Sequence, residues 1–339
     1  MARVTGLATT WIRTGIAFGV LCLWISTPGA WAATPIYRSV GPGNTSALAS
    51  GGGGNTLSLN SGTVTFGAAL PNTVGVGDVI QYDSDLNGSR DSLMFIHGRT
   101  SSTVFTVRTV SGAVPPVSVG TTFWELYRSY TSLYDAERGV ENTGILAGLR
   151  DFDTWSGGRD LVTNNETWHL ACYGDAADST SVTINGWNTD ATHYLRLFTP
   201  VSSAEVGTSQ RHTGVWTGSG AYRMVLTALI ELDAIWIQTN AVRLEGLQIF
   251  DSNINYNDEN AVQIDWTGSN MDIRVSHCIL RGDNGASSSG YQYGINNKSA
   301  GDGTIRIWNN LVYDFVGHNF DYAIQNQAAN FTVFMYNNT

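Results

Sequence analysis

A short alternating pattern occurs four times near the end of the chain, at residues 242–247, 273–278, 305–310 and 333–338. The four copies start 31, 32 and 28 residues apart, and each begins with an apolar, a polar or aromatic, and an apolar residue. Apolar spacing of two is typical of strands, whereas a helical repeat would need spacings of three and four. A repeat of this length built on a short strand predicts a solenoid of stacked strands.

A second series follows the first at a similar period. Residues 260–263, 293–296 and 322–325 begin 33 and 29 residues apart. Seven positions after the start of each complete first-series copy lies another apolar residue: Ile249, Leu280 or Val312. The sequence therefore predicts three short strands in every repeat, with Val242, Ile273 and Ile305 stacked on one another.

The pattern V-x-I-x-x-N-x-V, clearest at residues 305–312, resembles the right-handed parallel β-helix superfamily with the pectate-lyase-like fold. The resemblance covers residues from about 141 to 339. It implies an all-β fold, a right-handed parallel β-helix solenoid. The superfamily hosts lyases, hydrolases, epimerases, phage tailspikes and adhesins, so function has to be argued from a site.

The first 32 residues are predicted to be a signal peptide. Arg3 and Arg13 precede a short apolar run, and an A-x-A ending at Ala32 indicates a cleavage site. The apolar run is too short to span a membrane, and no later stretch is long and apolar enough to do so. We therefore expect an exported protein, secreted or held at the cell surface.

The net charge of the chain limits its possible binding partners, and the spacing of its cysteines bears on whether they form a disulfide. Without Arg3 and Arg13, 16 of the 18 basic residues remain against 28 acidic ones, a formal charge of −12. This opposes nucleic acid as a partner. Cys172 and Cys278 are about three repeats apart, roughly 14 Å at the spacing of strands, so we expect two buried free thiols.

Composition divides the rest of the chain into three parts. In residues 33–130, short segments alternate apolar and polar residues with period two and are separated by Gly, Asn, Asp or Pro. This pattern predicts a small antiparallel β domain. Residues 131–153 are predicted to form a short helical N-terminal cap, with one helix ending at Gly139 and a second over 143–152. Residues 154–339 are predicted to form the parallel β-helix. Because the pattern at 333–338 has no cap after it, we expect this part to be incomplete at its C-terminus.

One loop has the oxygen spacing of a calcium site. Starting from Asp83, side-chain oxygens occupy positions 1, 3, 5 and 9 of the loop and a glycine occupies position 6; these residues are Asp83, Asp85, Asn87, Asp91 and Gly88. Calcium prefers such hard oxygen ligands. Position 12 is Met94 instead of glutamate, and the flanking segments are predicted strands, so the loop is not an EF-hand. The alternatives are a calcium-binding strand–loop–strand and a polar hairpin turn.

Strand alternation places a row of arginines on the outside of the predicted sheet. The residue between each pair of inward apolar residues is Arg196, Arg243, Arg274 or Arg306, and Trp308 and Tyr336 lie two positions further along on the same face. Arginine beside aromatic rings suits an acidic polysaccharide, because guanidinium pairs with carboxylate or sulfate and a ring packs on sugar. The alternative is a solvated face on which the arginines pair with acids such as Glu245 and Asp272.

Catalysis has one weak candidate. Glu245 is the only acidic group that the repeat register places beside the arginines, whereas the aspartates at 265, 272, 283 and 302 do not share a register. Asn309, Asn310, Asn337 and Asn338 are interpreted as a structural ladder at a turn. The sequence thus predicts an exported β-helix protein that contacts extracellular polysaccharide, as a lyase or hydrolase, or alternatively as a non-catalytic adhesive or structural protein.

Overall fold

A computed structural model of the chain describes residues 32–116, 119–153, 155, 157–227, 233–252, 259–283, 291–316 and 322–339. The predicted signal peptide lies outside these residues except for Ala32. The described chain is all-β with only three short helical segments. Four sheets account for its strands, three of them parallel and one antiparallel.

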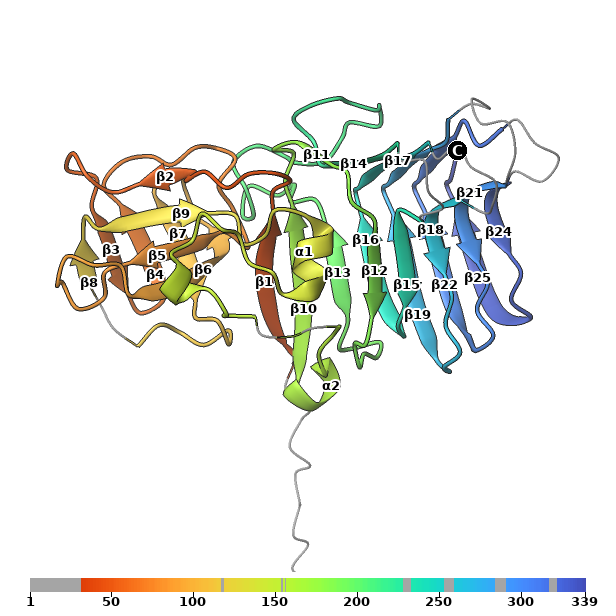
Figure 1. Cartoon of the computed structure of the whole chain (residues 1–339), viewed down its shortest axis with the longest axis horizontal. Coiled ribbons are helices and arrows are strands. Elements are labelled where there is room, and N and C mark those ends of the chain that lie inside the picture. Colours follow the sequence, from red (N-terminus) through yellow and green to blue (C-terminus); the bar gives the residue numbers. More distant parts are fainter. Residues whose placement is uncertain are drawn as a thin grey trace, which may run out of the picture. The chain divides into compact units, whose positions relative to one another are not determined.

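The first parallel sheet has seven strands in the order β1-β10-β13-β16-β19-β22-β25. Their bounds are Thr34–Val40, Glu166–Cys172, Leu195–Phe198, Ala241–Glu245, Met271–Ser276, Asp302–Trp308 and Asn330–Tyr336. Except for β1, each strand is three further along the chain than its neighbour in the sheet. Figure 1 shows β10 to β25 following one another from green to blue, with β1 in red-brown beside β10.

The other two parallel sheets have five strands each. One is β11 (Ala177–Asp178), β14 (Arg223–Leu226), β17 (Gln248–Asp251), β20 (Ile279–Arg281) and β23 (Leu311–Tyr313). The other is β12 (Val182–Asn185), β15 (Ile235–Gln238), β18 (Glu259–Ile264), β21 (Gln292–Asn297) and β24 (Tyr322–Asn326). From β10 onward the chain visits the three sheets in rotation, which confirms the prediction of three strands per repeat.

The register agrees with the sequence repeats. Val242 pairs with Ile273, and Ile273 pairs with Ile305. In the other two sheets Ile249, Leu280 and Val312 align, as do Asn260, Tyr293 and Tyr322. The inward apolar residues of all three sheets belong to one hydrophobic cluster. The exception is Met335, which is 57% exposed on the last strand of its sheet.

The turn after each of the last four strands of the seven-stranded sheet, β16, β19, β22 and β25, also repeats. Gly246, His277, Asn309 and Asn337 all have positive φ, between 53° and 80°. One residue further on, the Asn310 side chain accepts from the backbone N–H of Cys278 and donates to the Val275 carbonyl. These bonds satisfy backbone groups at the bend, so the predicted asparagine ladder is confirmed. Cys172 and Cys278 are both buried and unbridged, as expected.

The antiparallel sheet has eight strands in the order β2-β9-β5-β6-β7-β4-β3-β8. Their bounds are Ala49–Ser50, Trp124–Tyr127, Val79–Tyr82, Ser92–Arg99, Val104–Arg108, Thr63–Phe66, Leu57–Asn60 and Val119–Thr121. All eight strands lie within residues 33–130, where the sequence predicts an antiparallel β domain. The sheet packs around its own cluster, which includes Leu57, Phe66, Ile80, Phe105 and Trp124.

Two features of the N-terminal half differ from the sequence analysis. Residues 34–40 were assigned to the small β domain, but β1 pairs over its whole length with β10 in the seven-stranded sheet. The antiparallel strands β2 to β9 therefore lie, in sequence, between two neighbouring strands of a parallel sheet. Sequence pattern cannot reveal a pairing between segments about 130 residues apart, because it carries only local periodicity.

The helical zone is confirmed only in its first half. Helix α1 (Leu133–Arg138) is capped by Ser132 and ends at Gly139 in the left-handed region. The second helix predicted over 143–152 is wrong, because only a 3₁₀ turn, η1 (Ala147–Leu149), forms there. Gly144 and Gly148 weaken a helix at this point, and Ile145 packs against Val79, Phe95 and Tyr127. A further short helix, α2 (Leu161–Asn164), precedes β10.

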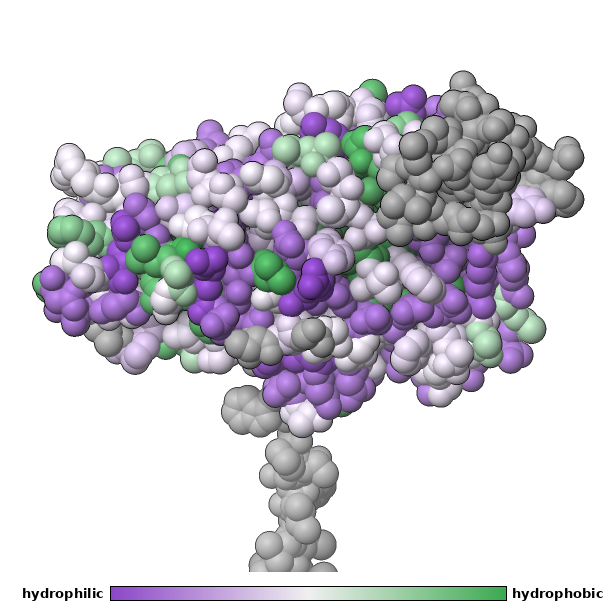
Figure 2. All heavy atoms as spheres, in the orientation of Figure 1, coloured by the Kyte–Doolittle hydropathy of each residue, from purple (hydrophilic) through white to green (hydrophobic). Residues whose placement is uncertain are grey.

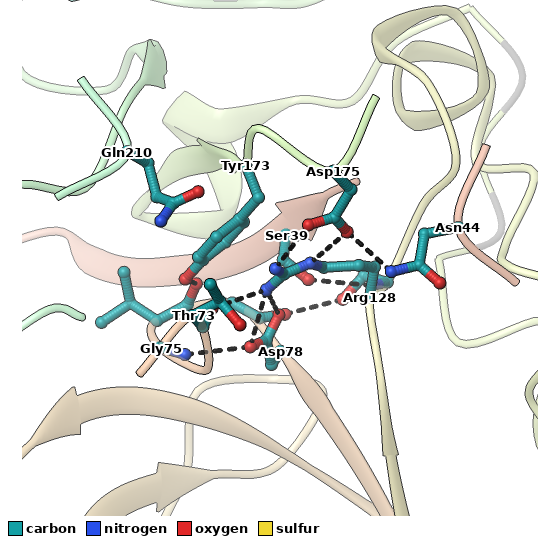
Figure 3. A network of polar contacts seen from close by, with 12 residues as sticks. Ser39, Asn44, Thr73, Gly75, Asp78, Arg128, Tyr173, Asp175 and Gln210 are labelled. Carbon is teal, nitrogen blue, oxygen red and sulfur yellow. Dashed lines mark hydrogen bonds and ion pairs between the residues drawn. The ribbon is translucent and has the colours of Figure 1, made fainter. Parts of the chain in front are cut away.

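Arg128 links the antiparallel sheet to the parallel sheets. Its guanidinium donates to the carboxylates of Asp78 and Asp175 at 2.8–3.0 Å and lies 3.6 Å from the centre of the Tyr173 ring (Figure 3). Asp78 precedes β5, whereas Tyr173 and Asp175 follow β10. A buried cation with two carboxylate partners holds these segments in one geometry.

Candidate functional site

The outer face of the seven-stranded sheet carries the predicted arginine row. Arg196, Arg243, Arg274 and Arg306 align one to the next, and Phe334 continues the row. All four arginines are partly exposed, between inward neighbours that are buried. Arg243 follows Arg196 by 47 positions, and because the two pair directly, this interval is a single repeat with a long connection and Arg196 belongs to the row.

The row extends further than the sequence repeats showed. His169 of β10 aligns with Arg196, and Tyr37 of β1 aligns with His169. The Tyr37 and His169 rings lie 4.7 Å apart. Neither residue belongs to a recognisable copy of the repeat, and only the strand pairing identifies them.

Glu245 neutralises one end of the row. Its Oε2 accepts from Nε and Nη2 of Arg196 at 3.0 and 2.6 Å, and its Oε1 accepts from Nη2 of Arg211 at 2.7 Å. Burial raises the pKa of Glu245, but the two guanidiniums outweigh it and hold the pKa below its usual value. The sequence placed Glu245 beside Arg243 and Arg274; its observed partners are Arg196 and Arg211. Arg211 lies in the long connection, where no periodic signal could place it.

Asp272 neutralises the other end. It accepts from Nη2 of Arg274 at 2.7 Å through Oδ2, and from Nη1 of Arg306 at 2.6 Å through Oδ1. Asp272 comes from β19, as Arg274 does, while Arg306 comes from β22. Each of the two carboxylates thus bridges two arginines. This agrees in part with the alternative that the sequence left open, a solvated face on which the arginines pair with acids.

Arg243 differs from its neighbours in having no carboxylate within ion-pair distance among the described residues. Its recorded hydrogen bond runs from Nη2 to the Ala191 carbonyl at 3.1 Å. Its guanidinium carbon lies 3.2 Å from the centre of the Tyr194 ring. Burial lowers the pKa of Arg243, and the nearby charges of Arg274 and Arg196 lower it further, whereas Tyr194 and the charge of Asp272 raise it. The middle member of the row, Arg243, is therefore held by its contact with the Tyr194 ring rather than by an ion pair.

A cavity of about 340 Å³ opens around Arg243. Its lining residues come from five strands of the sheet and the turns beside them: His169, Tyr194, Arg196, Arg243, Leu244, Glu245, Arg274, Ser276, His277 and Trp308. A second cavity of about 470 Å³ adjoins it, since Arg274 lines both; Asp272 and Arg306 also line the second. The two form a polar hollow along the outer face of the sheet.

The two histidines of the first cavity are neutral near pH 7. Burial lowers the pKa of His169 to about 3, and Arg196 and Arg243 add to the effect. Burial also lowers the pKa of His277, which the Arg211 charge lowers further. The cavity thus presents three guanidiniums and one carboxylate.

An aromatic surface adjoins this hollow. The Trp308 and Tyr336 rings are stacked with 5.9 Å between their centres and 15° between their planes. Trp308 lines the first cavity, and Tyr336 is 49% exposed. The arginine row and the two aromatic residues predicted beside it therefore lie on one face.

The acidic loop lies elsewhere, between β5 and β6. Carboxylate oxygens of Asp83, Asp85 and Asp91 come within 4.8 Å of one another. The Asn87 side chain is engaged within the loop, because its Nδ2 donates to Asp85 and its Oδ1 accepts from Ser89. Met94 is fully buried in the core of the antiparallel sheet and supplies no ligand. Three of the four predicted residues thus offer grouped carboxylates that suit a hard cation.

Comparisons with known proteins give no relative: no family model, no curated protein and no solved structure matches this chain. Within the described residues, no helix has both the length and the apolar character needed to cross a bilayer. The side drawn in Figure 2 is mainly polar, with apolar residues in small separate patches.

Proposed function

We propose that this protein is an exported right-handed parallel β-helix of the pectate-lyase-like type that binds an extracellular polysaccharide. The rotation of the chain through three parallel sheets supports the fold assignment, together with the repeated left-handed turn position and the asparagine ladder. The A-x-A motif before Ala33 supports export.

The observation that carries the binding function is the polar hollow on the outer face of the seven-stranded sheet. Two adjoining cavities lie along it, and they combine guanidiniums with the ring of Trp308. Guanidinium groups bind carboxylate or sulfate through two parallel hydrogen bonds, and an aromatic ring covers the apolar face of a sugar. The preferred ligand is therefore a polysaccharide with acidic groups.

Binding is better supported than hydrolysis. Most glycoside hydrolases need two carboxyl groups flanking the scissile bond. Glu245 is the one carboxylate among the lining residues of the first cavity, and two arginines hold it in its ionised form. Such a group is a poor proton donor at neutral pH. If the protein is an enzyme, elimination on a uronate suits this site better than hydrolysis.

Calorimetric titration tests the proposal. The full-length mature protein is titrated with polygalacturonate, alginate, dextran sulfate and a neutral glucan. We expect heat from at least one acidic polymer, with affinity that falls as salt increases, because partly exposed charge pairs are screened. Ultraviolet absorbance of unsaturated products in the same mixtures separates a lyase from a binding protein. Absence of binding by every acidic polymer at low salt would contradict the proposal.

Calcium is the cofactor that we propose for the antiparallel sheet. The grouped oxygens of Asp83, Asp85 and Asp91 support it, with hard ligands converging at the end of a hairpin. These residues lie in a different sheet from the arginine row, so calcium here would stabilise the loop without taking part in ligand binding.

A further inference from the structure

Arg243 is the exception in a row of otherwise paired arginines. Its neighbours Arg196 and Arg274 each bond a carboxylate, Glu245 or Asp272, at 2.6–2.7 Å. Arg243 lies between them in register and has no such partner among the described residues. Burial removes solvation from this cation, and Asp272 acts on it only from beyond ion-pair distance, so a bound anion would stabilise it directly.

The hydrogen-bonding capacity of Arg243 is largely unused. A guanidinium carries five N–H donors, and within the described part of the chain this one donates a single hydrogen bond, to the Ala191 carbonyl. The buried Nε has no partner among the described residues. Buried polar atoms are normally paired, so the unpartnered Nε is unusual. Because Nε itself is buried, a ligand that enters the cavity would meet the Nη groups of the partly exposed guanidinium.

The cavity around Arg243 has further unmet polar atoms. The Nδ1 atoms of His169 and His277, two of its lining residues, are also buried without a partner in the described structure. The Nε2 of His277 faces the Nδ2 of Asn309 at 3.1 Å, and an amide nitrogen only donates. In the neutral ring the proton therefore resides on Nδ1, which leaves a second unused donor beside the cavity.

Tyr194 fixes the orientation of the guanidinium. Stacking at 3.2 Å from the ring centre covers one face of the group. A stacked guanidinium keeps its N–H groups in the plane, where they can form two parallel bonds to an oxyanion. The opposite part of the cavity includes Trp308, at a distance of two strands in the sheet.

We propose that Arg243 is the specificity-determining cation of this face, and that it binds a single carboxylate or sulfate group of the polysaccharide. The sugar that carries this group packs toward Trp308, while Arg196 and Arg274 keep their bonds to Glu245 and Asp272. This inference rests on the proposed polysaccharide-binding function and identifies which arginine recognises the charge.

The test compares two substitutions in the same row. Arg243→Gln removes the unpaired cation, and Arg306→Gln removes one that is paired with Asp272 and does not line the first cavity. Each variant and the wild type are titrated with polygalacturonate and with dextran sulfate, and circular dichroism checks that all are folded. We expect Arg243→Gln to weaken binding of the acidic polymer roughly tenfold or more, and Arg306→Gln less than about threefold.

The two polymers identify the source of the charge. If the wild type prefers polygalacturonate and Arg243→Gln loses this preference, the bound group is a uronate carboxylate. If the same holds for dextran sulfate, the bound group is a sulfate ester. Arg243→Lys keeps the charge but loses the planar fork, so we expect affinity between those of the wild type and Arg243→Gln. If Arg243→Gln does not fold, unchanged affinity in Arg243→Lys is the result that overturns the proposal.

Failure of this inference is distinguishable from failure of the proposed function. Equal affinity of the wild type and Arg243→Gln for an acidic polymer overturns the role of Arg243 but leaves the proposed polysaccharide binding intact. Equal losses in Arg243→Gln and Arg306→Gln would mean that the whole row acts as an undifferentiated charge, which also overturns it. No binding by the wild type overturns both.

Discussion

Arg128 and Asp78 form an ion pair in which both side chains are fully buried, with 2.8 Å between Nη1 and Oδ1 (Figure 3). Asp78 comes from the antiparallel part of the chain. Asp175, the second partner of Arg128, follows β10 of the seven-stranded sheet. The arginine therefore serves two carboxylates from different sheets, and its removal would leave a buried charge without compensation.

We predict that Arg128→Met lowers the free energy of unfolding by about 3–5 kcal/mol, because breaking a buried pair strands its partner. Urea denaturation followed by circular dichroism measures the change. Arg138→Met is the control, since Arg138 is exposed on α1 and should change stability by less than about 0.5 kcal/mol. Similar losses in the two variants would contradict the role assigned to Arg128.

Glu137 should make stability depend on pH. Burial raises its pKa from 4.5 to about 7, although N–H groups of Asn185 and Trp187 partly offset this. The folded protein therefore binds this proton more readily than the unfolded chain. Stability from this group rises as pH falls from above 7 towards 4.5, by up to about 3 kcal/mol.

Glu137→Gln should accordingly be more stable than the wild type at pH 8, and the difference should vanish near pH 4.5. Glu245→Gln is a control, because the contribution of Glu245 to stability should change with pH in the opposite direction. Because the folded-state pKa of Glu245 is lowered, its contribution is present above the unfolded-state pKa and is lost as pH falls. Chemical denaturation of the three proteins from pH 8 down to well below the ordinary glutamate pKa measures both trends. Parallel pH profiles for wild type and Glu137→Gln would refute the assignment.

The asparagine ladder should contribute to stability through the backbone groups that it satisfies. Asn310→Ala removes the acceptor of the Cys278 N–H and the donor to the Val275 carbonyl, and both groups lie in a buried turn. We expect a loss of about 1–3 kcal/mol in the free energy of unfolding. Asn330→Ala, at an exposed strand end, should be nearly neutral by the same denaturation experiment. The ladder would be dispensable if both variants unfold at the same urea concentration.

Trp308 should contribute to ligand binding by packing more than by charge. Trp308→Ala is expected to weaken acidic polysaccharide binding roughly three- to tenfold and to leave the salt dependence of the affinity nearly unchanged. Calorimetry at two salt concentrations measures both quantities. Trp216→Ala is the matched control, because Trp216 is a partly exposed tryptophan that meets Phe250 edge-to-face away from the cavity. A steep change in salt dependence would assign Trp308 an electrostatic role instead.

Calcium binding has its own matched pair of variants. Asp85→Asn removes one of the three grouped carboxylates, while Asp151→Asn changes an exposed aspartate outside the loop. We expect calorimetric heat from calcium with the wild type and Asp151→Asn, and an affinity at least roughly tenfold lower for Asp85→Asn. Absence of heat from the wild type at millimolar calcium would end the proposal.

The sequence by itself determined the parallel sheets from the first clear repeat onward. Val242, Ile273 and Ile305 stack because a two-residue alternation, repeated at a nearly constant period, specifies both the inward face and the register. The same alternation placed Arg196, Arg243, Arg274 and Arg306 in one outward row. These properties are local and repeated, so the order of residues carries them.

Only the tertiary structure decided how that row is completed and which of its members is free. β1 pairs with β10 although all the antiparallel strands lie between them in sequence, and Arg211 bonds Glu245 from a long connection. Such contacts depend on where a chain closes a large loop, and they leave no periodic trace in the sequence. The sequence supplied the row of arginines; the contacts of Glu245 and Asp272 left Arg243 as its unpaired member, because each carboxylate had two closer guanidiniums.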